Sequence, residues 1–308
     1  MEAKQLSELE IQNLFLNFLK DEPHPGVNNI LKKAGYNLNS IERDIKTSIG
    51  QISFDLCFSH PKDNSIMALE IKGGRIIDKE EKQFSRYNNF DKQEYASNTG
   101  LAYDENTLFD TFIVANFENL DPLKSLVKKR YINLKYSVID SQENKLNIDN
   151  RASTNVINTL HDKTNIFDVN EIIEIIHFDK ETSPYEIAIK LLTQIDSIIL
   201  SPSRNSFTVD EILSKAYCVD ESVYKKVGSL VKTTAQNRIL KLLKLASKIG
   251  YKDLLSWSKE NKEWVINKSK LSHSTLKKAR NNLLSHIEIN GLGDKEENQL
   301  SMEDFGVE

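Results

Sequence analysis

The sequence predicts an α/β domain followed by a mainly helical domain. Apolar residues recur at every second position in most of the stretch from residue 41 to residue 71, which indicates strands, and helix and strand patterns then alternate to about residue 139. The strand patterns fade after about residue 151, where helical patterns take over. The chain has 308 residues, enough for two domains of ordinary size. We therefore expect domains at residues 1–148 and 149–290, and an acidic, disordered tail at 291–308.

The first predicted element is an amphipathic helix. Ser7 and Glu10 have the spacing of a capping box, in which each side chain binds the backbone N–H of the other residue. Apolar residues then follow with helical spacing as far as Phe18, and two prolines end the pattern a few residues later. A second, short helix is expected at residues 27–34.

Strand patterns dominate the next forty residues. Apolar residues alternate with polar ones from Ile41 to Ile45, again from Ile52 to Phe58, and a third time from Met67 to Ile71. Two glycines end the third pattern. The remaining elements of the first domain are expected as a helix at 78–95, a strand at 111–115, a helix at 122–129 and a strand at 134–139.

Helical signals characterise the second half of the chain. A long helix begins at Ser183 and Pro184, since proline is well tolerated at the first helical position. Thr208 begins another capping-box pattern, and a further helix is expected over residues 236–249. These patterns predict that helices, rather than a large sheet, form the second domain.

The charge is distributed unevenly along the chain. The whole sequence has 41 basic and 45 acidic residues, for a net charge of −4. Residues 221–290, however, hold 15 Lys and Arg residues against 5 acidic ones, whereas residues 291–308 hold one Lys and six acidic residues. A basic block of this kind is typical of a surface that binds nucleic-acid phosphates, and a set of solvated, lysine-rich helix faces is the alternative.

Composition excludes several other classes of protein. The longest apolar runs fall well short of the roughly 20 residues that a membrane span needs, and the first residues are polar, so we expect a cytoplasmic protein without a membrane partner. Cys57 and Cys218 are too few for a disulfide framework or a cysteine-based zinc site. We expect both to be buried thiols.

Two neighbouring strand patterns carry the residues of chemical interest. In the stretch from Ile52 to Phe58 the apolar side chains share one face, which leaves Asp55 on the other. The next pattern leaves Glu70 and Lys72 together on the face opposite its apolar residues. The short polar connection favours a hairpin, which would bring Asp55 close to Glu70 and Lys72.

Two carboxylates and one ammonium in this arrangement suit metal-assisted hydrolysis of a phosphodiester bond. Mg²⁺ binds through one or two carboxylates and keeps waters and substrate phosphate oxygens as its other ligands. A lysine beside it can orient the attacking water and offset the charge that develops at phosphorus. The alternative is an exposed ion pair of Lys72 with Asp55 or Glu70, which would contribute little to stability.

The same residues resemble a known nuclease motif. The matching stretches are Phe54-Asp55, Glu70-Ile71-Lys72 and Gln83-x-x-x-Tyr87 on the following helix. Together they resemble the PD-(D/E)XK nuclease superfamily, in particular its branch with a Gln-x-x-x-Tyr motif, over about residues 5–140. The resemblance implies a restriction-endonuclease-like mixed sheet flanked by helices. It also implies roles for individual residues: Asp55, Glu70 and the carbonyl of Ile71 as ligands of Mg²⁺ or Mn²⁺, Lys72 at the water, and Gln83 and Tyr87 in support.

The sequence departs from the superfamily pattern at one position and offers two candidates at another. The proline that gives the superfamily its name is Phe54 here. Related nucleases often place a glutamate on the first helix near the metal, and both Glu8 and Glu10 are available. Glu8 fits this role better, because Ile11 and Phe15 follow on its face of the helix, whereas Glu10 is the expected capping-box partner.

The basic block contains two stretches that resemble DNA-binding elements. Residues 271–283 resemble the recognition helix of a helix-turn-helix, and residues 207–266 resemble a winged helix with 262–266 as a wing strand. The residues expected to face outward and contact phosphates and base edges are Lys277, Lys278, Arg280 and Asn281. A protein-interaction or packing domain is the alternative.

The sequence thus predicts a Mg²⁺-dependent deoxyribonuclease, more specifically an endonuclease, with DNA as its partner and a homo-oligomer or a partner protein as a further association. The resemblance alone favours DNA over RNA, and its type I-like motif indicates defence against foreign DNA. The alternative is a catalytically inactive DNA-binding or assembly subunit that retains the nuclease fold.

Overall fold

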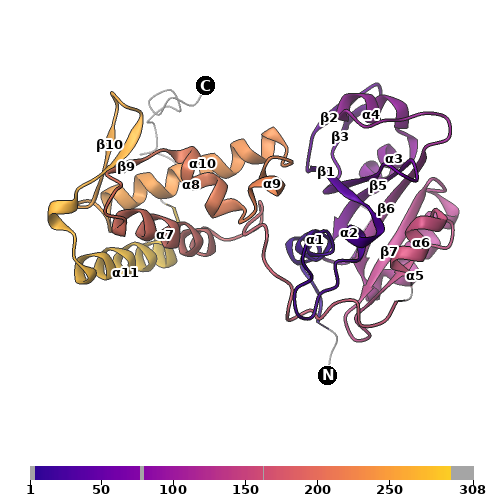
Figure 1. The fold of residues 1–308 in the computed structure, drawn as a ribbon, viewed down its shortest axis with the longest axis horizontal. Coiled ribbons are helices and arrows are strands. Elements are labelled where there is room, and N and C mark those ends of the chain that lie inside the picture. The colour runs from indigo at the N-terminus through magenta and orange to yellow at the C-terminus, as the bar shows by residue number, and fades with distance from the viewer. Residues whose placement is uncertain (1–3, 77–79, 162, 293–308) are drawn as a thin grey trace. The chain divides into compact units, whose positions relative to one another are not determined.

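A computed structural model describes residues 4–76, 80–161 and 163–292 of the chain. The chain divides into two compact units, of which the first holds the residues up to Ile175 together with Lys225–Val231 (Figure 1). The second holds Ile176–Tyr224 and the residues from Lys232 on. The first unit thus extends beyond the expected boundary at residue 148. The expected acidic tail lies, from residue 293 on, outside the described residues.

Contacts with the first helix explain why the first unit extends to Ile175. Helix α1 (Glu8–Asn17) carries two buried asparagines. Asn13 Oδ1 accepts a hydrogen bond from the backbone N–H of Ile175 at 2.9 Å, and Asn17 Nδ2 donates to the carbonyl of Ile173 at 2.8 Å. These bonds hold the stretch before residue 176 against the first unit.

A mixed six-stranded sheet forms the centre of the first unit (Figure 1). The strand order is β1-β4-β5-β6-β7-β8, in which β5, β6 and β7 are parallel and the outer pairings are antiparallel. This confirms the α/β class. The strands are β1 (Asn37–Ile41), β4 (Leu56–His60), β5 (Ser65–Lys72), β6 (Leu108–Asn116), β7 (Leu134–Asp140) and β8 (Lys145–Ile148), and a separate hairpin is formed by β2 (Ile45–Thr47) and β3 (Gly50–Ile52).

Helices cover both faces of this sheet. On one face, the Phe15 ring of α1 packs 6.5 Å from the Phe58 ring of β4. On the other face, Ala68 of β5 belongs to a buried cluster that also includes Phe84 and Leu123. The helices that contribute to this cluster are α3 (Glu81–Asn89), α4 (Lys92–Thr99) and α5 (Leu120–Lys129), and the unit also contains α2 (Ile30–Ala34) and α6 (Thr154–Leu160).

Two expectations for the first unit need correction. The single helix expected at 78–95 is two helices, α3 and α4, because Asp91 caps α4 by accepting hydrogen bonds from the backbone N–H groups of Gln93 and Glu94; residues 77–79 lie outside the described ranges. The strand expected over 52–58 is interrupted, since β3 ends at Ile52 and β4 begins at Leu56. Asp55 therefore lies just before β4 rather than within a strand. The predicted capping boxes that begin at Ser7 and at Thr208 are both present.

The second unit is mainly helical, as predicted, with a small sheet. Its elements are α7 (Pro184–Leu200), β9 (Ser206–Phe207), α8 (Val209–Tyr217), α9 (Glu221–Tyr224), β10 (Leu255–Ser258), β11 (Glu263–Ile266), α11 (His273–Asn290) and α10 (Ser229–Lys248) except for its first three residues, which belong to the first unit. The three strands pair in the order β10-β11-β9. Trp264 of β11 is among the largest fully buried side chains and anchors the sheet to the core.

A short segment from the second half of the chain completes the edge of the first sheet. Ile41, the last residue of β1, donates its N–H to the carbonyl of Lys226 at 3.0 Å and accepts the N–H of Gly228 at 2.8 Å. Glycine is required here, since a Cβ atom on Gly228 would lie 2.2 Å from the carbonyl oxygen of Glu42. The edge of β1 is thereby paired where Lys226 and Gly228 contact it.

Both cysteines are buried free thiols, as predicted. Burial raises the pKa of Cys57 to about 12 and that of Cys218 to about 11. Across the described ranges, none of the helices combines the length and the apolar character that crossing a membrane requires.

Candidate active site

The pairing of β4 with β5 brings two predicted carboxylates together. Leu56 pairs with Leu69, so Asp55, one residue before β4, lies opposite Glu70. The backbone N–H of Ile71 donates to Asp55 Oδ2 at 2.5 Å, which fixes this carboxylate against the end of β5. The proximity expected from the hairpin pattern is therefore confirmed.

Lys72 and Glu70 form an ion pair that is buried. Lys72 Nζ lies 2.6 Å from Glu70 Oε1, and the two side chains are 13% and 3% exposed. A further carboxylate oxygen, of Glu80, lies 4.0 Å from the same ammonium. The exposed ion pair considered from the sequence is thus excluded. Burial of charged groups costs desolvation free energy, so this ion pair is expected to contribute little to the stability of the fold.

Helix α3 supplies two side chains that hold Glu70. Gln83 Nε2 donates to Glu70 Oε1 at 2.6 Å and approaches Tyr87 Oη at 3.1 Å. The Tyr87 hydroxyl in turn donates to the carbonyl of Ser53 at 2.5 Å. The Phe54 ring packs on the Tyr87 ring, with 4.6 Å between centroids. The aromatic residue at the place of the motif's proline therefore supports the same chain of hydrogen bonds.

The site holds more carboxyl groups than its single lysine can pair with. Burial raises the pKa of Asp55 well above its ordinary value, and the nearby charges of Glu70 and Glu42 raise it further. Burial also raises the pKa of Glu70, although Lys72 opposes this. For Lys72, burial acts to lower the pKa, but Glu70, Asp55 and Glu8 outweigh it and the pKa is raised. An added cation would pair with the carboxyl groups in excess.

The two glutamates of the first helix lie in different surroundings, and the predicted capping role of Glu10 is confirmed. Glu10 caps α1 through Ser7, whose N–H it accepts at 2.8 Å, and pairs with Lys4 at 3.0 Å. The charge of Glu8 instead acts on Glu70. Glu8 therefore faces the candidate site, and Glu10 does not take part in it.

Two further residues of the site were not predicted. Gln12 Nε2 lies 3.3 Å from Glu42 Oε1 and 3.4 Å from the carbonyl of Asp55. Gln12 follows Glu8 by four residues, so its place on the same helix face was a usable signal. Glu42 has a positive φ of 44° just after β1, and no sequence pattern marks it.

The donor atoms present fit a hard divalent cation. Within the described ranges, no group of three or more His, Cys, Asp or Glu side chains is close enough to hold a metal ion by itself. Mg²⁺ does not need such a group, since it takes one or two carboxylates and completes its shell with water and phosphate oxygens. Asp55 and Glu70 supply two carboxylates beside a single lysine, which suits this mode of binding.

The predicted DNA contacts of the second unit lie on α11. Lys277, Lys278 and Asn281 are exposed there, as expected. Arg280 is only partly exposed, and its Nη1 lies 3.5 Å from Asp196 Oδ2 of α7, so its expected outward position needs correction. This contact joins α11 to α7.

Comparison of the chain with protein-family models, with curated proteins and with solved structures finds no match.

Proposed function

We propose that the protein is a metal-dependent nuclease that hydrolyses phosphodiester bonds of DNA. The observation that carries this proposal is the meeting of Asp55, Glu70 and Lys72 at the end of β5, in a buried setting where carboxyl groups outnumber the lysine. The resemblance to the PD-(D/E)XK motif supports the same function, and a role in defence against foreign DNA is proposed from that motif alone.

Each residue has a distinct task in this proposal. Asp55, Glu70 and the carbonyl of Ile71 would hold Mg²⁺ or Mn²⁺, with Glu8 nearby. The bound ion would supply Lewis acidity toward the phosphodiester and lower the pKa of water. Lys72, 2.6 Å from Glu70, orients the attacking water and offsets charge at the phosphate. Gln83 and Tyr87 are positioning residues, since they fix Glu70 from α3.

The second unit is proposed to bind DNA. Its order of helix α7, strand β9, helices α8 and α10, and hairpin β10–β11 supports the winged-helix interpretation. In a helix-turn-helix the second helix enters the major groove, which favours α10 as the reading helix and the hairpin as the wing. Lys277, Lys278 and Asn281 of α11 would then add contacts outside that motif.

A cleavage assay tests the proposal. The full chain would be incubated with labelled plasmid, linear duplex and single-stranded DNA in Mg²⁺, Mn²⁺ or EDTA, beside Asp55→Ala, Lys72→Ala and the exposed control Lys128→Ala. We expect cutting that needs the metal, is lost in the first two variants and is retained in the control. Nicking of closed plasmid would identify an endonuclease.

Two results would contradict this assignment. Cutting that survives Asp55→Ala or Lys72→Ala in a folded variant would remove that residue from the site. A wild type that binds DNA but cuts none of the substrates in either metal would favour the alternative of a DNA-binding or assembly subunit that retains the fold.

A further inference from the structure

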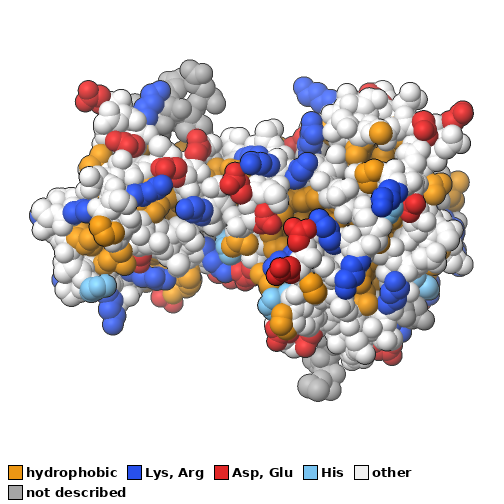
Figure 2. Space-filling view, viewed as in Figure 1, with side chains coloured by type: hydrophobic (Ala, Val, Ile, Leu, Met, Phe, Trp, Pro, Cys, Tyr) orange, Lys and Arg blue, Asp and Glu red, His pale blue; other side chains and the backbone are white. Residues whose placement is uncertain are grey.

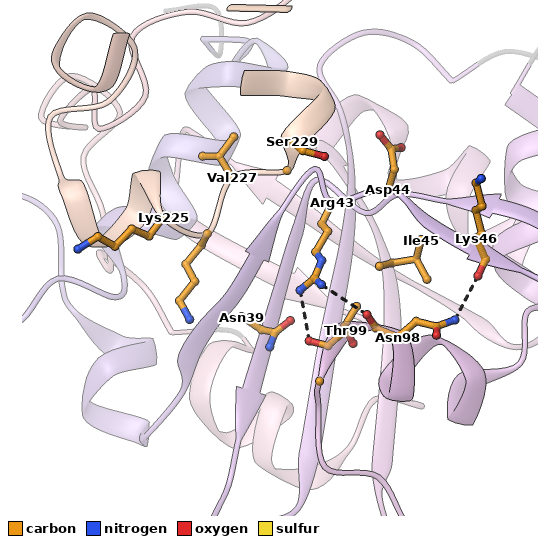
Figure 3. A pocket seen from close by; sticks show the side chains of 13 residues that line it. Asn39, Arg43, Asp44, Ile45, Lys46, Asn98, Thr99, Lys225, Val227 and Ser229 are labelled. Atoms are coloured by element: carbon orange, nitrogen blue, oxygen red, sulfur yellow. Dashed lines mark hydrogen bonds between the residues drawn. The ribbon is translucent and has the colours of Figure 1, made fainter. Parts of the chain in front are cut away.

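A polar pocket lies in the first unit beside the end of β1 (Figure 3). Its volume is about 860 Å³, and every residue that lines it belongs to the first unit, since Lys225–Val231 is part of that unit. Two stretches distant in sequence form most of its wall, residues 39–46 and residues 225–229. Basic and acidic side chains are interspersed over the face of the molecule that Figure 2 shows.

The pocket is strongly basic. Four cationic residues line it, against the single carboxylate of Asp44. The Asp44 carboxylate accepts a hydrogen bond from Gln51 Nε2 at 2.5 Å. The cationic residues are Arg43, Lys46, Lys225 and Lys226.

Arg43 is held in place without a carboxylate partner. Its guanidinium extends between Asn39 and Thr99 and donates to the carbonyls of Thr99 at 3.3 Å and Asn98 at 3.5 Å (Figure 3). Within the described part of the chain, neither Arg43 nor Lys226 forms an ion pair. A guanidinium has five N–H donors, so Arg43 keeps donors for a ligand in the pocket.

The lysines reach the pocket because their segment is docked. The hydrogen bonds of Ile41 with Lys226 and Gly228 fix the backbone of residues 226–228 along β1. The close approach of Gly228 to Glu42 brings this segment to the turn that carries Arg43. Positive charge from two distant parts of the chain is thus assembled by backbone contacts.

The backbone at residues 42 and 43 links the pocket to the candidate active site. Arg43 lines the pocket, and its neighbour Glu42 acts electrostatically on Asp55 and accepts a hydrogen bond from Gln12. One turn of backbone therefore places a cation in the pocket and a carboxylate at the site. A nucleic-acid strand that presents a phosphate to Asp55 would have further phosphates available for the cations next to it.

We infer that this pocket binds backbone phosphates of the nucleic-acid strand beside the bond that is cut. This inference rests on the proposed function and adds a substrate subsite to it. Phosphates rather than a nucleobase are the expected ligand, because no aromatic side chain lines the pocket among the described residues, and sites for bases commonly stack them on aromatic rings. The contact is independent of base identity, since phosphates carry no direct sequence information.

Salt-dependent DNA binding tests the subsite. Anisotropy of fluorescein-labelled 20-nucleotide single strands and duplexes would be measured in EDTA for the full-length wild type, Arg43→Gln/Lys226→Gln and a matched control, Lys128→Gln/Lys129→Gln on α5. For single strands we expect the pocket variant to lose about tenfold in affinity and the slope of log Kd against log salt to fall by about 1.5, since each phosphate contact accounts for about 0.7. The control should match wild type. If the pocket variant is not folded, Lys46→Gln/Lys226→Gln replaces it and leaves the bonds of Arg43 intact.

Further measurements separate the possible failures. In cleavage assays the pocket variant should raise KM and leave kcat near wild type, because the subsite binds substrate away from the reacting atoms. Unchanged affinity, salt slope and KM in the pocket variant, with wild type cutting DNA, would overturn the subsite and leave the nuclease proposal standing. Weaker DNA binding in that variant, with a wild type that cuts nothing, would support the subsite and refute the nuclease. If ATP or inorganic phosphate raises the Tm of wild type but not of the variant, and DNA binding is unchanged in the variant, the pocket takes a free anion and the inference is wrong.

Discussion

Two clusters of acidic and basic side chains in the first unit, each of which includes a buried carboxylate, differ in their charge balance. Asp149 and Arg151 form a pair in which Arg151 Nε lies 3.0 Å and 3.2 Å from the two carboxylate oxygens and the Arg151 guanidinium also donates to the carbonyls of Ile132 and Leu134. The positive charge of Arg151 thus balances the negative charge of Asp149. At the end of β5, by contrast, Asp55 and Glu70 share the single ammonium of Lys72.

The pKa values of the two clusters shift in opposite directions. Burial would raise the pKa of Asp149, but the hydrogen bonds and charge of Arg151 outweigh it and the pKa is lowered. The pKa of Asp55 is raised by burial and by its neighbouring carboxylates. A carboxylate whose pKa is lowered by a cationic partner is typical of a structural pair, whereas a buried carboxylate whose pKa is raised marks a candidate functional site.

Removing the charge of Asp55 should change the cleavage rate more than any other substitution proposed for this comparison. Asp55→Asn keeps the shape of the side chain and can keep the hydrogen bond from Ile71. We expect cleavage to fall about 10³-fold, while unfolding by urea in EDTA shows a gain of about 1 kcal/mol, because a site built for function is often improved in stability by such a change. A loss of stability instead of a gain would make Asp55 a structural residue like Asp149.

The opposite change in stability is expected when the Asp149–Arg151 pair is broken. Asp149→Ala leaves Arg151 without its carboxylate and should lower the free energy of unfolding by about 2 kcal/mol, since the partly exposed guanidinium regains some solvation. Activity at low temperature should not change. Glu143→Ala, which removes a more exposed partner of Lys145, is the control and should cost less than about 0.5 kcal/mol. Equal losses in both variants would show that the Asp149 pair is no more structural than a surface pair.

The two glutamates of α1 allow the comparison to be repeated within one helix. Glu8→Gln should lower cleavage about tenfold and leave stability unchanged, because Glu8 acts on Glu70 and Lys72. Glu10→Gln should leave cleavage unchanged and lower stability by about 0.5 kcal/mol, because it weakens the capping box. Cleavage kinetics and urea unfolding of both variants measure these effects. If the two variants behave in the reverse way, Glu10 rather than Glu8 belongs to the site.

The smallest effect should be the pH dependence of stability without metal. Since the pKa of Asp55 is raised in the folded state, its contribution to stability is present below its unfolded pKa, near 4, and is lost as pH rises through the folded value. Asp149 behaves in the opposite way, and its contribution is lost only at lower pH. Wild type should therefore lose stability relative to Asp55→Asn in EDTA as pH rises above about 4. A constant difference above that pH would contradict the raised pKa, and Mg²⁺ should remove the trend.

The sequence predicted local features of the site better than distant ones. Alternation in Met67–Lys72 was enough to place Glu70 and Lys72 on one face, because side chains in a strand alternate regardless of the partner. The capping boxes were equally local. Asp91, three residues before Glu94, has similar spacing, and it could have revealed the break between α3 and α4.

The features that the sequence did not predict depend on contacts between residues far apart in the chain. Strand β8 is short and has only two buried positions, so its pattern is too brief to identify. Glu42 reaches Asp55 through a turn with positive φ, and Lys226 reaches β1 from 185 residues away, counted from Ile41. Neither contact leaves a periodic signature in the sequence. The same holds for Arg280, whose partner Asp196 lies on another helix.

The docked segment at β1 also bears on how the protein is made. A chain grows from its N-terminus, and domains generally fold as they emerge from the ribosome. The first unit ends its main stretch at Ile175, but Ile41 finds its partners only when residues 226–228 have been synthesised, some fifty residues later. During that interval the edge of the nascent sheet is open to pairing with other chains, a known route to aggregation. A fragment cut at residue 175 would keep this open edge permanently and should associate with itself.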